Sequence, residues 1–124
     1  MYICGITATP ENQRMAKTAL GSTDSVDWEY VEEPKELIEK LKRDDIIIVS
    51  VEQADKSITI QDFNPTNKSD YAFVFGNEVD GVREEFIKAS KHVLEIPQVG
   101  TKHSLNVSVA AGIILWDFFD KKNI

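Results

Sequence analysis

Short apolar runs of β type alternate along the chain with segments of helical periodicity. Residues Ile46–Val51 (IIIVSV) are almost all apolar, which is typical of a strand whose sheet is covered on both faces. Val26–Val31 alternates apolar and polar positions and favours a half-buried strand. Pro34–Arg43 (PKELIEKLKR) repeats its apolar residues at helical spacing, with Pro34 at a favoured first-turn position. The remaining predicted elements are strands at Tyr2–Ile6, Tyr71–Phe75 and Val93–Ile96, a short strand or turn at Ser57–Ile60, and helices at Val82–Ser90 and Leu105–Phe119.

This alternation of strands and helices predicts a three-layer α/β domain with a mainly parallel sheet. A chain of 124 residues is expected to form one domain with a substantial core. No apolar run approaches the ~20 residues of a membrane span, and the first residues lack the pattern of a signal peptide. The single cysteine, Cys4, excludes an intramolecular disulfide, and its apolar surroundings favour burial over a reactive role. We therefore expect a cytoplasmic protein.

The net charge of −7 argues against strong nonspecific binding to nucleic acid. Only small basic patches are present, Arg14 with Lys17 and Lys102 with His103. Taken alone, the charge favours a small molecule or a protein over RNA as the partner.

The stretch FGNEVDG joins a predicted strand to a predicted helix. In an open α/β sheet, ligands bind at the carboxyl ends of the strands, so this loop lies where a site is expected. Gly76 and Gly81 would allow close backbone approach or a positive φ, and Asp80 would cap the helix. A tight turn with a cap explains these three residues equally well, but Asn77 and Glu78 exceed what a cap requires.

The final predicted helix is apolar on every side, yet it opens with Ser104, Asn106 and Ser108. Such a helix must be covered all round, and its small residues Ala110–Gly112 would allow close backbone approach. One N-cap explains one polar residue and leaves at least one unexplained. Free N–H groups at a helix start also bind ligands. Because this loop and the previous one both follow strand ends, they would face each other across a pocket.

Several other kinds of site are excluded by the sequence pattern. His92 and His103 are too few and too isolated for a metal cluster, so no metal is expected. Neither GxGxxG nor GxxxxGK[ST] occurs, which excludes the usual dinucleotide and P-loop sites. Ser104 with His103 is not a nucleophile pair, because adjacent residues at a helix start point in different directions.

The segment FGNEVDGV followed by IPQVGTKHSLNVSVAAGI resembles the second and third signature motifs of the SpoU (TrmH-like) branch of the SPOUT RNA methyltransferases. Two ordered motifs agree at many positions, and the resemblance extends over nearly the whole chain. It implies an S-adenosylmethionine-dependent 2′-O-ribose methyltransferase of tRNA or rRNA. It also implies a homodimer and a C-terminal trefoil knot, the SPOUT α/β knot, although general topology rules argue against knots.

The resemblance implies a role for particular residues of the two motifs. The positions that it places in or beside the active site are Glu78, Ser104 and Asn106. The positions that it assigns to the cofactor are Phe75, Gly76, Asn77, Gly81, Ile96, Pro97, Ser104, Leu105 and Asn106. The basic residues expected to approach the RNA are Arg14, Lys17 and Lys102.

The chain departs from the family in one respect. The family's first motif, an Asn and an Arg on a strand–helix unit, has no counterpart here, and Met1 falls about where the next strand begins. That Arg is the base, or assists the base, for the ribose hydroxyl, and such assistance typically contributes ~10²–10⁴-fold. We therefore expect a SpoU-type domain over residues 1–124 that binds the cofactor but transfers methyl poorly. A truncated gene product, a fragment made for expression and a natural short form all fit.

Three functions stay open at this stage. The first is a SpoU-type methyltransferase domain, and the second is a noncatalytic relative that binds cofactor or RNA. The third is a protein-interaction α/β module without a cofactor. Asn77, Glu78, Ser104 and Asn106 favour the first two.

Overall fold

A computed structural model describes residues 2–4, 29–54, 56–66, 68–76, 81–97 and 107–122 of the chain. The chain divides into two compact units, Met1–Glu39 and Lys40–Ile124. In the described part, no helix is long and apolar enough to cross a membrane.

The first unit contains a pair of parallel strands, β1 (Tyr2–Cys4) and β2 (Glu29–Val31). Both lie within predicted strands, whose other residues are outside the described part, as is the side chain of Cys4. Helix α3 (Pro34–Arg43) begins in this unit and ends in the second, with the bounds that the apolar periodicity predicts. Three apolar side chains at helical spacing are buried, which confirms the predicted face: Leu37, Ile38 and Leu41.

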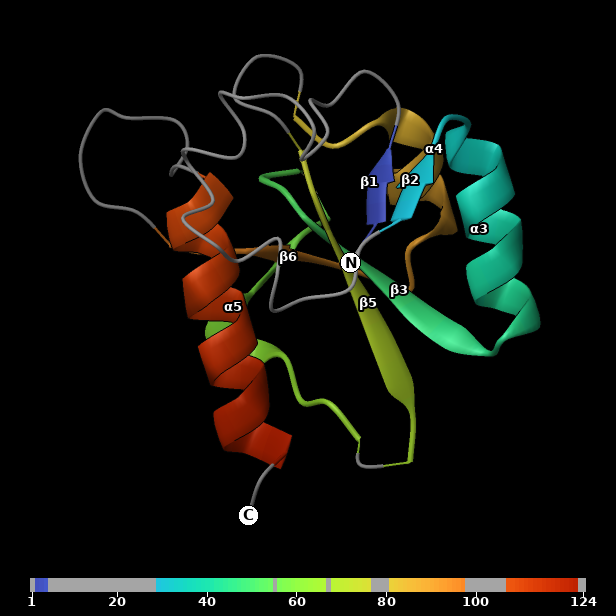
Figure 1. The fold of residues 1–124 in the computed structure, drawn as a ribbon. Helices are drawn as coiled ribbons and strands as arrows, with labels where there is room; N and C mark the ends of the chain where they lie inside the picture. Colours follow the sequence, from blue (N-terminus) through green and yellow to red (C-terminus); the bar gives the residue numbers. More distant parts are fainter. Residues whose placement is uncertain are drawn as a thin grey trace. The chain divides into compact units, whose positions relative to one another are not determined.

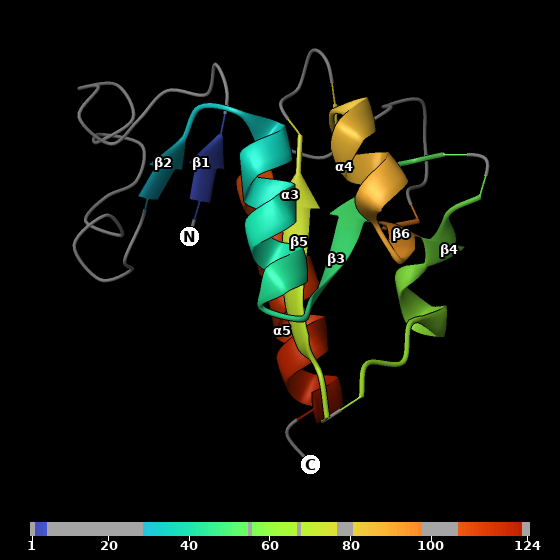
Figure 2. The same ribbon diagram turned by 90° about the vertical axis from the view of Figure 1, so that its right-hand side faces the viewer.

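The second unit is built on a four-stranded sheet in which every neighbouring pair of strands is parallel (Figures 1 and 2). The strand order is β4-β6-β3-β5, and the mainly parallel α/β sheet expected from the sequence is thereby confirmed. The bounds are β3 Ile46–Val51, β4 Ile58–Thr59, β5 Asp70–Phe75 and β6 His92–Glu95.

Helices lie on both faces of β3, one of the two inner strands of the sheet. Val49 belongs to a buried cluster with Ile114 of α5 (Val107–Lys122). The hydroxyl of Ser50, the next residue along the strand, lies 2.6 Å from the hydroxyl of Ser90 at the end of α4 (Glu84–Ala89). Because successive side chains of a strand point to opposite faces, α4 and α5 lie on opposite sides of the sheet, as Figure 2 shows. The apolar run of β3 is therefore covered on both faces, as predicted.

The core on the α5 side gathers residues that are distant in the sequence. Its buried members are Val49, Ile60, Phe63, Leu94 and Ile114. Aromatic rings extend it in edge-to-face contacts, with the ring centroid of Phe63 5.8 Å from that of Tyr71 and 6.3 Å from that of Phe73. Such contacts add to the stability that area burial provides.

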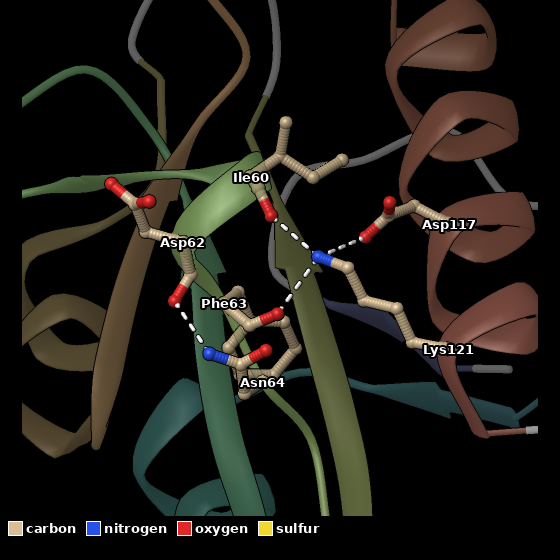
Figure 3. Close-up of polar contacts among 6 residues, drawn as sticks. All are labelled: Ile60, Asp62, Phe63, Asn64, Asp117 and Lys121. Carbon is tan, nitrogen blue, oxygen red and sulfur yellow. Dashed lines mark hydrogen bonds and ion pairs between the residues drawn. The ribbon is translucent and has the colours of Figure 1, made fainter.

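The end of α5 is tied to the 3-10 turn η1 (Ile60–Asp62) through Lys121 (Figure 3). The Lys121 ammonium donates hydrogen bonds of 2.7 Å to the carbonyl oxygens of Ile60 and Phe63. It also pairs with the Asp117 carboxylate at 2.8 Å, one turn back along the helix. Hydrogen bonds from a charged donor are stronger than neutral ones, so this contact holds the final helix against the sheet.

Two expectations about the final helix are wrong for the single chain. Its outward side is not covered, because five large apolar side chains are exposed: Val109, Ile113, Leu115, Trp116 and Phe119. A Cβ at Gly112 would meet no atom of the described residues within 4 Å, so Gly112 provides no close approach to them within the single chain. The helix buries one stripe, centred on Ile114, and exposes the other.

The cap proposed for the preceding helix is also wrong. Helix α4 begins at Glu84 instead of Val82, and its N-cap is Arg83, which makes no side-chain cap hydrogen bond. Asp80 is therefore three residues before the cap position. Val82 is instead buried in the connection that precedes the helix.

Stability should depend on pH through His92, whose ring lies 5.5 Å from the ring of Phe63. Burial, and then the positive charge of Lys91, lower the pKa of the His92 side chain below its ordinary 6.5. At a pH below about 6.5, His92 binds a proton more readily in the unfolded chain than in the folded chain. The free energy of unfolding should therefore fall as the pH drops below about 6.5. Denaturant titrations between about pH 7.5 and about pH 5 should show this fall reduced in His92→Gln. Parallel pH profiles for the two proteins would contradict the assignment to His92.

Candidate functional site

The sheet brings the two motif loops to the same level on either side of one strand. Val51, the last residue of β3, pairs with Phe75 of β5 on one side and with Leu94 of β6 on the other. Phe75 opens the FGNEVDG loop, and Leu94 comes two residues before Ile96 of the second loop. Since neighbouring strands lie about 4.8 Å apart, the loops leave the sheet roughly 10 Å from each other. The two loops thus begin on either side of β3, and their facing each other across a pocket stays a prediction.

The structure describes part of the predicted site. Five of its residues are described, at the ends of the two loops: Phe75, Gly76, Gly81, Ile96 and Pro97. Lying outside the described residues are Asn77, Glu78, Asp80, Ser104, Leu105, Asn106, and the basic residues Arg14, Lys17 and Lys102. The roles assigned to these residues stay predictions.

The described ends of the FGNEVDG loop touch each other. A Cβ added to Gly76 would lie 1.9 Å from the carbonyl carbon of Gly81 and 2.3 Å from the backbone nitrogen of Val82. Only a glycine permits this approach, since both clashing groups are backbone. Gly81 adopts a φ of +67°, a left-handed conformation that glycine tolerates without strain. The two glycines of the motif therefore close the loop on itself.

The carboxylate of Glu52 secures this closure, and no sequence pattern pointed to it. Its Oε2 accepts a 2.7 Å hydrogen bond from the backbone N–H of Val82, thirty positions along the chain. The backbone N–H of Glu52 donates to the carbonyl oxygen of Leu94 at 2.9 Å. One signal was available: an acidic residue directly after a buried strand, at the carboxyl end where sites are expected.

The side chains at the strand ends are suited to an organic ligand. Phe75 and Ile96 are half-buried and pack against the core, while Pro97 is exposed. They put apolar side chains at the starts of both loops, and binding sites commonly combine apolar walls with a few polar groups. The described residues contain no group of three or more His, Cys, Asp or Glu side chains that would hold a metal ion.

Comparison with known families agrees with this geometry. The profile of the SpoU rRNA Methylase family matches residues 1–116. The chain belongs to this family. The matched region includes both motif strands and most of α5.

Two relatives with assigned activities illustrate the range of the SpoU family. The tRNA (guanosine(18)-2'-O)-methyltransferase of Borreliella burgdorferi is 32% identical over 97 residues, which cover 78% of this chain and 44% of that protein. The 23S rRNA (guanosine-2'-O-)-methyltransferase RlmB of Neisseria meningitidis serogroup B is 32% identical over 105 residues, which cover 84% of this chain and 40% of that protein. The chain thus spans less than half the length of these relatives.

Solved SpoU structures share the fold. The TrmH/SpoU tRNA modifying enzyme of A. aeolicus matches with a TM-score of 0.78 at 27% identity, over 99% of this chain and 62% of that chain. The SpoU methyltransferase AviRb of Streptomyces viridochromogenes, solved in complex with the cofactor AdoMet, matches with a TM-score of 0.84 at 20% identity, over 98% of this chain and 49% of that chain. At this identity the second likeness shows the fold alone.

Proposed function

We propose that this protein is an S-adenosylmethionine-dependent 2′-O-ribose methyltransferase of tRNA or rRNA. The observation that carries the proposal is the register of the sheet, which sets Phe75 and Leu94 on either side of Val51. The two motif loops therefore start next to each other, as a site made from both requires. Family membership and the activities named for the relatives support the same reaction. The AviRb complex supports the choice of cofactor.

The proposed reaction joins the ribose 2′-oxygen to a methyl carbon. S-adenosylmethionine supplies a methyl group activated by its sulfonium. A carbon–oxygen bond would form as the carbon–sulfur bond breaks, S-adenosylhomocysteine would leave, and the hydroxyl proton would pass to solvent water. Within this chain, Glu78, Ser104 and Asn106 are proposed to orient the hydroxyl, because the reaction depends on alignment of the attacking oxygen.

The cofactor is proposed to lie against the two loops. The described ends would fit it through the apolar side chains of Phe75 and Ile96, which are half-buried at the starts of the two loops. The residues proposed to hold it are Phe75, Gly76, Asn77, Gly81, Ile96, Pro97, Ser104, Leu105 and Asn106. The family also supports a C-terminal trefoil knot, one SpoU-type domain over residues 1–124, a cytoplasmic setting, and RNA contacts from Arg14, Lys17 and Lys102.

The proposal is tested by measuring binding and transfer separately. Calorimetry with S-adenosylmethionine should show binding, and a radiolabelled methyl-transfer assay on bulk tRNA and rRNA should detect a 2′-O-methylated product only at a low rate, because transfer by this chain is expected to be poor. Robust methylation would contradict the expectation of poor transfer. No binding would refute the cofactor site. Binding without transfer on any RNA would refute the enzymatic proposal and favour a noncatalytic relative.

A variant pair tests the third motif. Asn106→Ala should weaken cofactor binding or transfer far more than it lowers stability, because loss of a helix cap costs only about 1 kcal/mol. Asn64→Ala is the matched control, since it makes the same chemical change at an exposed residue outside the two loops. Equal effects of the two substitutions on binding would show that Asn106 has no special role.

We further propose a homodimer through the exposed face of α5. The apolar face comprises Val109, Ile113, Leu115, Trp116 and Phe119. Contiguous apolar surface of this kind is unusual on a monomer and commonly marks an interaction site. An isologous dimer would cover it in both copies.

Trp116→Glu should convert the dimer to a monomer. The indole is 66% exposed and lies 5.8 Å from the Phe119 ring, so a carboxylate there would put charge into the proposed interface. Sedimentation at micromolar concentration is the measurement. Gln61→Glu, which adds the same charge at an exposed position of η1, should leave the assembly unchanged. A wild-type monomer would refute the dimer.

A further inference from the structure

Glu52 connects the two motif regions through different parts of one residue. Its backbone N–H donates to the Leu94 carbonyl oxygen and so extends the pairing of β3 with β6. Its side chain reaches the other way, where Oε2 accepts the Val82 N–H at 2.7 Å. The third-motif strand and the exit of the second-motif loop are thus joined through a single residue.

The carboxylate also occupies the space beside Gly81. A Cβ added to Gly81 would lie 2.3 Å from Oε2 of Glu52. The absence of a side chain at Gly81 therefore lets the carboxylate approach the backbone closely enough to accept the next N–H. On its other side, the Gly81 backbone contacts Gly76, whose added Cβ would meet its carbonyl carbon at 1.9 Å. Gly81 is held between Glu52 and Gly76.

The hydrogen bond is of a strong kind. A carboxylate that accepts a backbone N–H forms a charge-assisted bond, roughly twice as strong as a neutral one. Oε1 of the same group accepts the Gln53 N–H at 3.3 Å, which limits rotation of the carboxylate. Both oxygens therefore have partners.

We propose that Glu52 is a positioning residue that fixes Gly81 and Val82 against Gly76 and thereby sets the affinity of the site for S-adenosylmethionine. The inference rests on the proposed function, because it assigns the cofactor to this site. It follows from the geometry: one end of the loop continues from β5, and the other is held by the Glu52 carboxylate. If that hold is lost, the backbone groups at the loop end move, and misplacement by about 1 Å can cost about 10²-fold in function.

Three substitutions at Glu52 separate the acceptor from the charge. Glu52→Ala removes the acceptor, and Glu52→Asp withdraws it by one methylene. Both should raise the calorimetric Kd for S-adenosylmethionine by about ten- to a hundredfold. Glu52→Gln keeps an acceptor oxygen and should restore most of the affinity. In the transfer assay, the losses should appear in KM for the cofactor more than in kcat.

Asp62→Asn is the matched control. The Asp62 carboxylate accepts a hydrogen bond of 3.1 Å from the Thr59 hydroxyl, and it lies in η1, outside the two loops. The Asp62→Asn variant should leave the Kd within about twofold of the wild type, because distant sites with no shared partners act independently. If Glu52→Ala does not fold, Glu52→Asp carries the test.

A double substitution tests the contact itself. Gly81→Ala alone should raise the Kd, because the methyl group collides with Glu52 and alanine disfavours the positive φ. In a Glu52→Ala background the collision is gone, so Gly81→Ala should cost less there. Additive effects of the two substitutions would overturn the coupling.

A readout without cofactor separates this inference from the proposed function. The amide resonance of Val82 should shift, and its hydrogen exchange should accelerate, in Glu52→Ala but not in Asp62→Asn. If the wild type does not bind S-adenosylmethionine but the Val82 amide still responds to Glu52→Ala, the proposed function is refuted and the Glu52 contact is supported. If Glu52→Ala and Glu52→Asp bind the cofactor as tightly as the wild type, the positioning role is overturned, even if both variants are less stable.

Discussion

Gly76→Ala is expected to abolish detectable binding of S-adenosylmethionine. The new methyl carbon would lie 1.9 Å from the carbonyl carbon of Gly81, 2.2 Å from its oxygen and 2.3 Å from the nitrogen of Val82. All three are backbone atoms, so no flexible side chain can yield. The chain must move Gly76 away from Gly81 and open the loop, and we expect a loss of about 10²-fold or more in affinity and in kcat/KM. Calorimetry and the methyl-transfer assay measure both.

Gly112→Ala is the control for this experiment. A Cβ at Gly112 meets no atom of the described residues within 4 Å, and the residue lies inside α5. Alanine favours a helix interior by about 1 kcal/mol over glycine, so this variant should be at least as stable as the wild type and bind the cofactor normally. If Gly76→Ala binds as tightly as Gly112→Ala, the loop closure does not shape the cofactor site.

Ile114→Ala is expected to be the most destabilising substitution on α5. Ile114 is 2% exposed and belongs to the cluster with Val49, Phe63 and Leu94. Truncation of such a side chain leaves a cavity and typically costs 2–5 kcal/mol, about a third of the stability of an ordinary domain. Chemical denaturation at several protein concentrations should show this loss in the free energy of unfolding at each of them.

The neighbouring Ile113→Ala makes the same chemical change at an exposed position of the helix. Ile113 is 38% exposed in the single chain, so its truncation should lower the unfolding free energy of the monomer by less than about 1 kcal/mol. It should instead weaken the proposed dimer in sedimentation, which Ile114→Ala should not do at temperatures where it is folded. Equal losses of stability in the two variants would contradict the observed orientation of α5.

Local patterns were enough to predict the elements whose ends depend on their own residues. Helix α3 and strand β3 have the predicted bounds, Pro34–Arg43 and Ile46–Val51. Helical spacing that starts with a proline and a continuous apolar run are properties of single segments. The start of α4 was placed too early, at Val82, because a short polar loop with an aspartate resembles a capped helix. In the structure, the Val82 N–H donates a hydrogen bond to the Glu52 carboxylate. Local propensity cannot predict this contact between residues that are distant in the sequence.

The sequence predicted that two loops form the site, but it predicted only part of the arrangement of their residues in space. The motif residues and their position after strands could be inferred, and the adjacency of Phe75 and Leu94 around Val51 agrees. The assignments of Glu78, Ser104 and Asn106 stay predictions, since these residues lie outside the described part. Glu52 was not found, because its partner Val82 is thirty positions away and its one signal, an acidic residue directly after a buried strand, does not point to that partner.

The amino-acid sequence by itself determined that this chain forms a mainly parallel α/β sheet with SpoU motifs at strand ends, because apolar periodicity and motif order are carried by consecutive residues. Only the tertiary structure decided which side of the last helix is buried. Helix α5 has apolar residues on all of its sides, so its sequence pattern does not indicate which face is buried. The side of Ile114 is buried because it packs in the cluster with Val49 and Phe63. The tertiary structure also decided how the FGNEVDG loop closes. That closure needs Gly76, Gly81 and Glu52 at contact distance, and such distances between remote residues arise only when parallel pairing sets β3 beside β5 and β6.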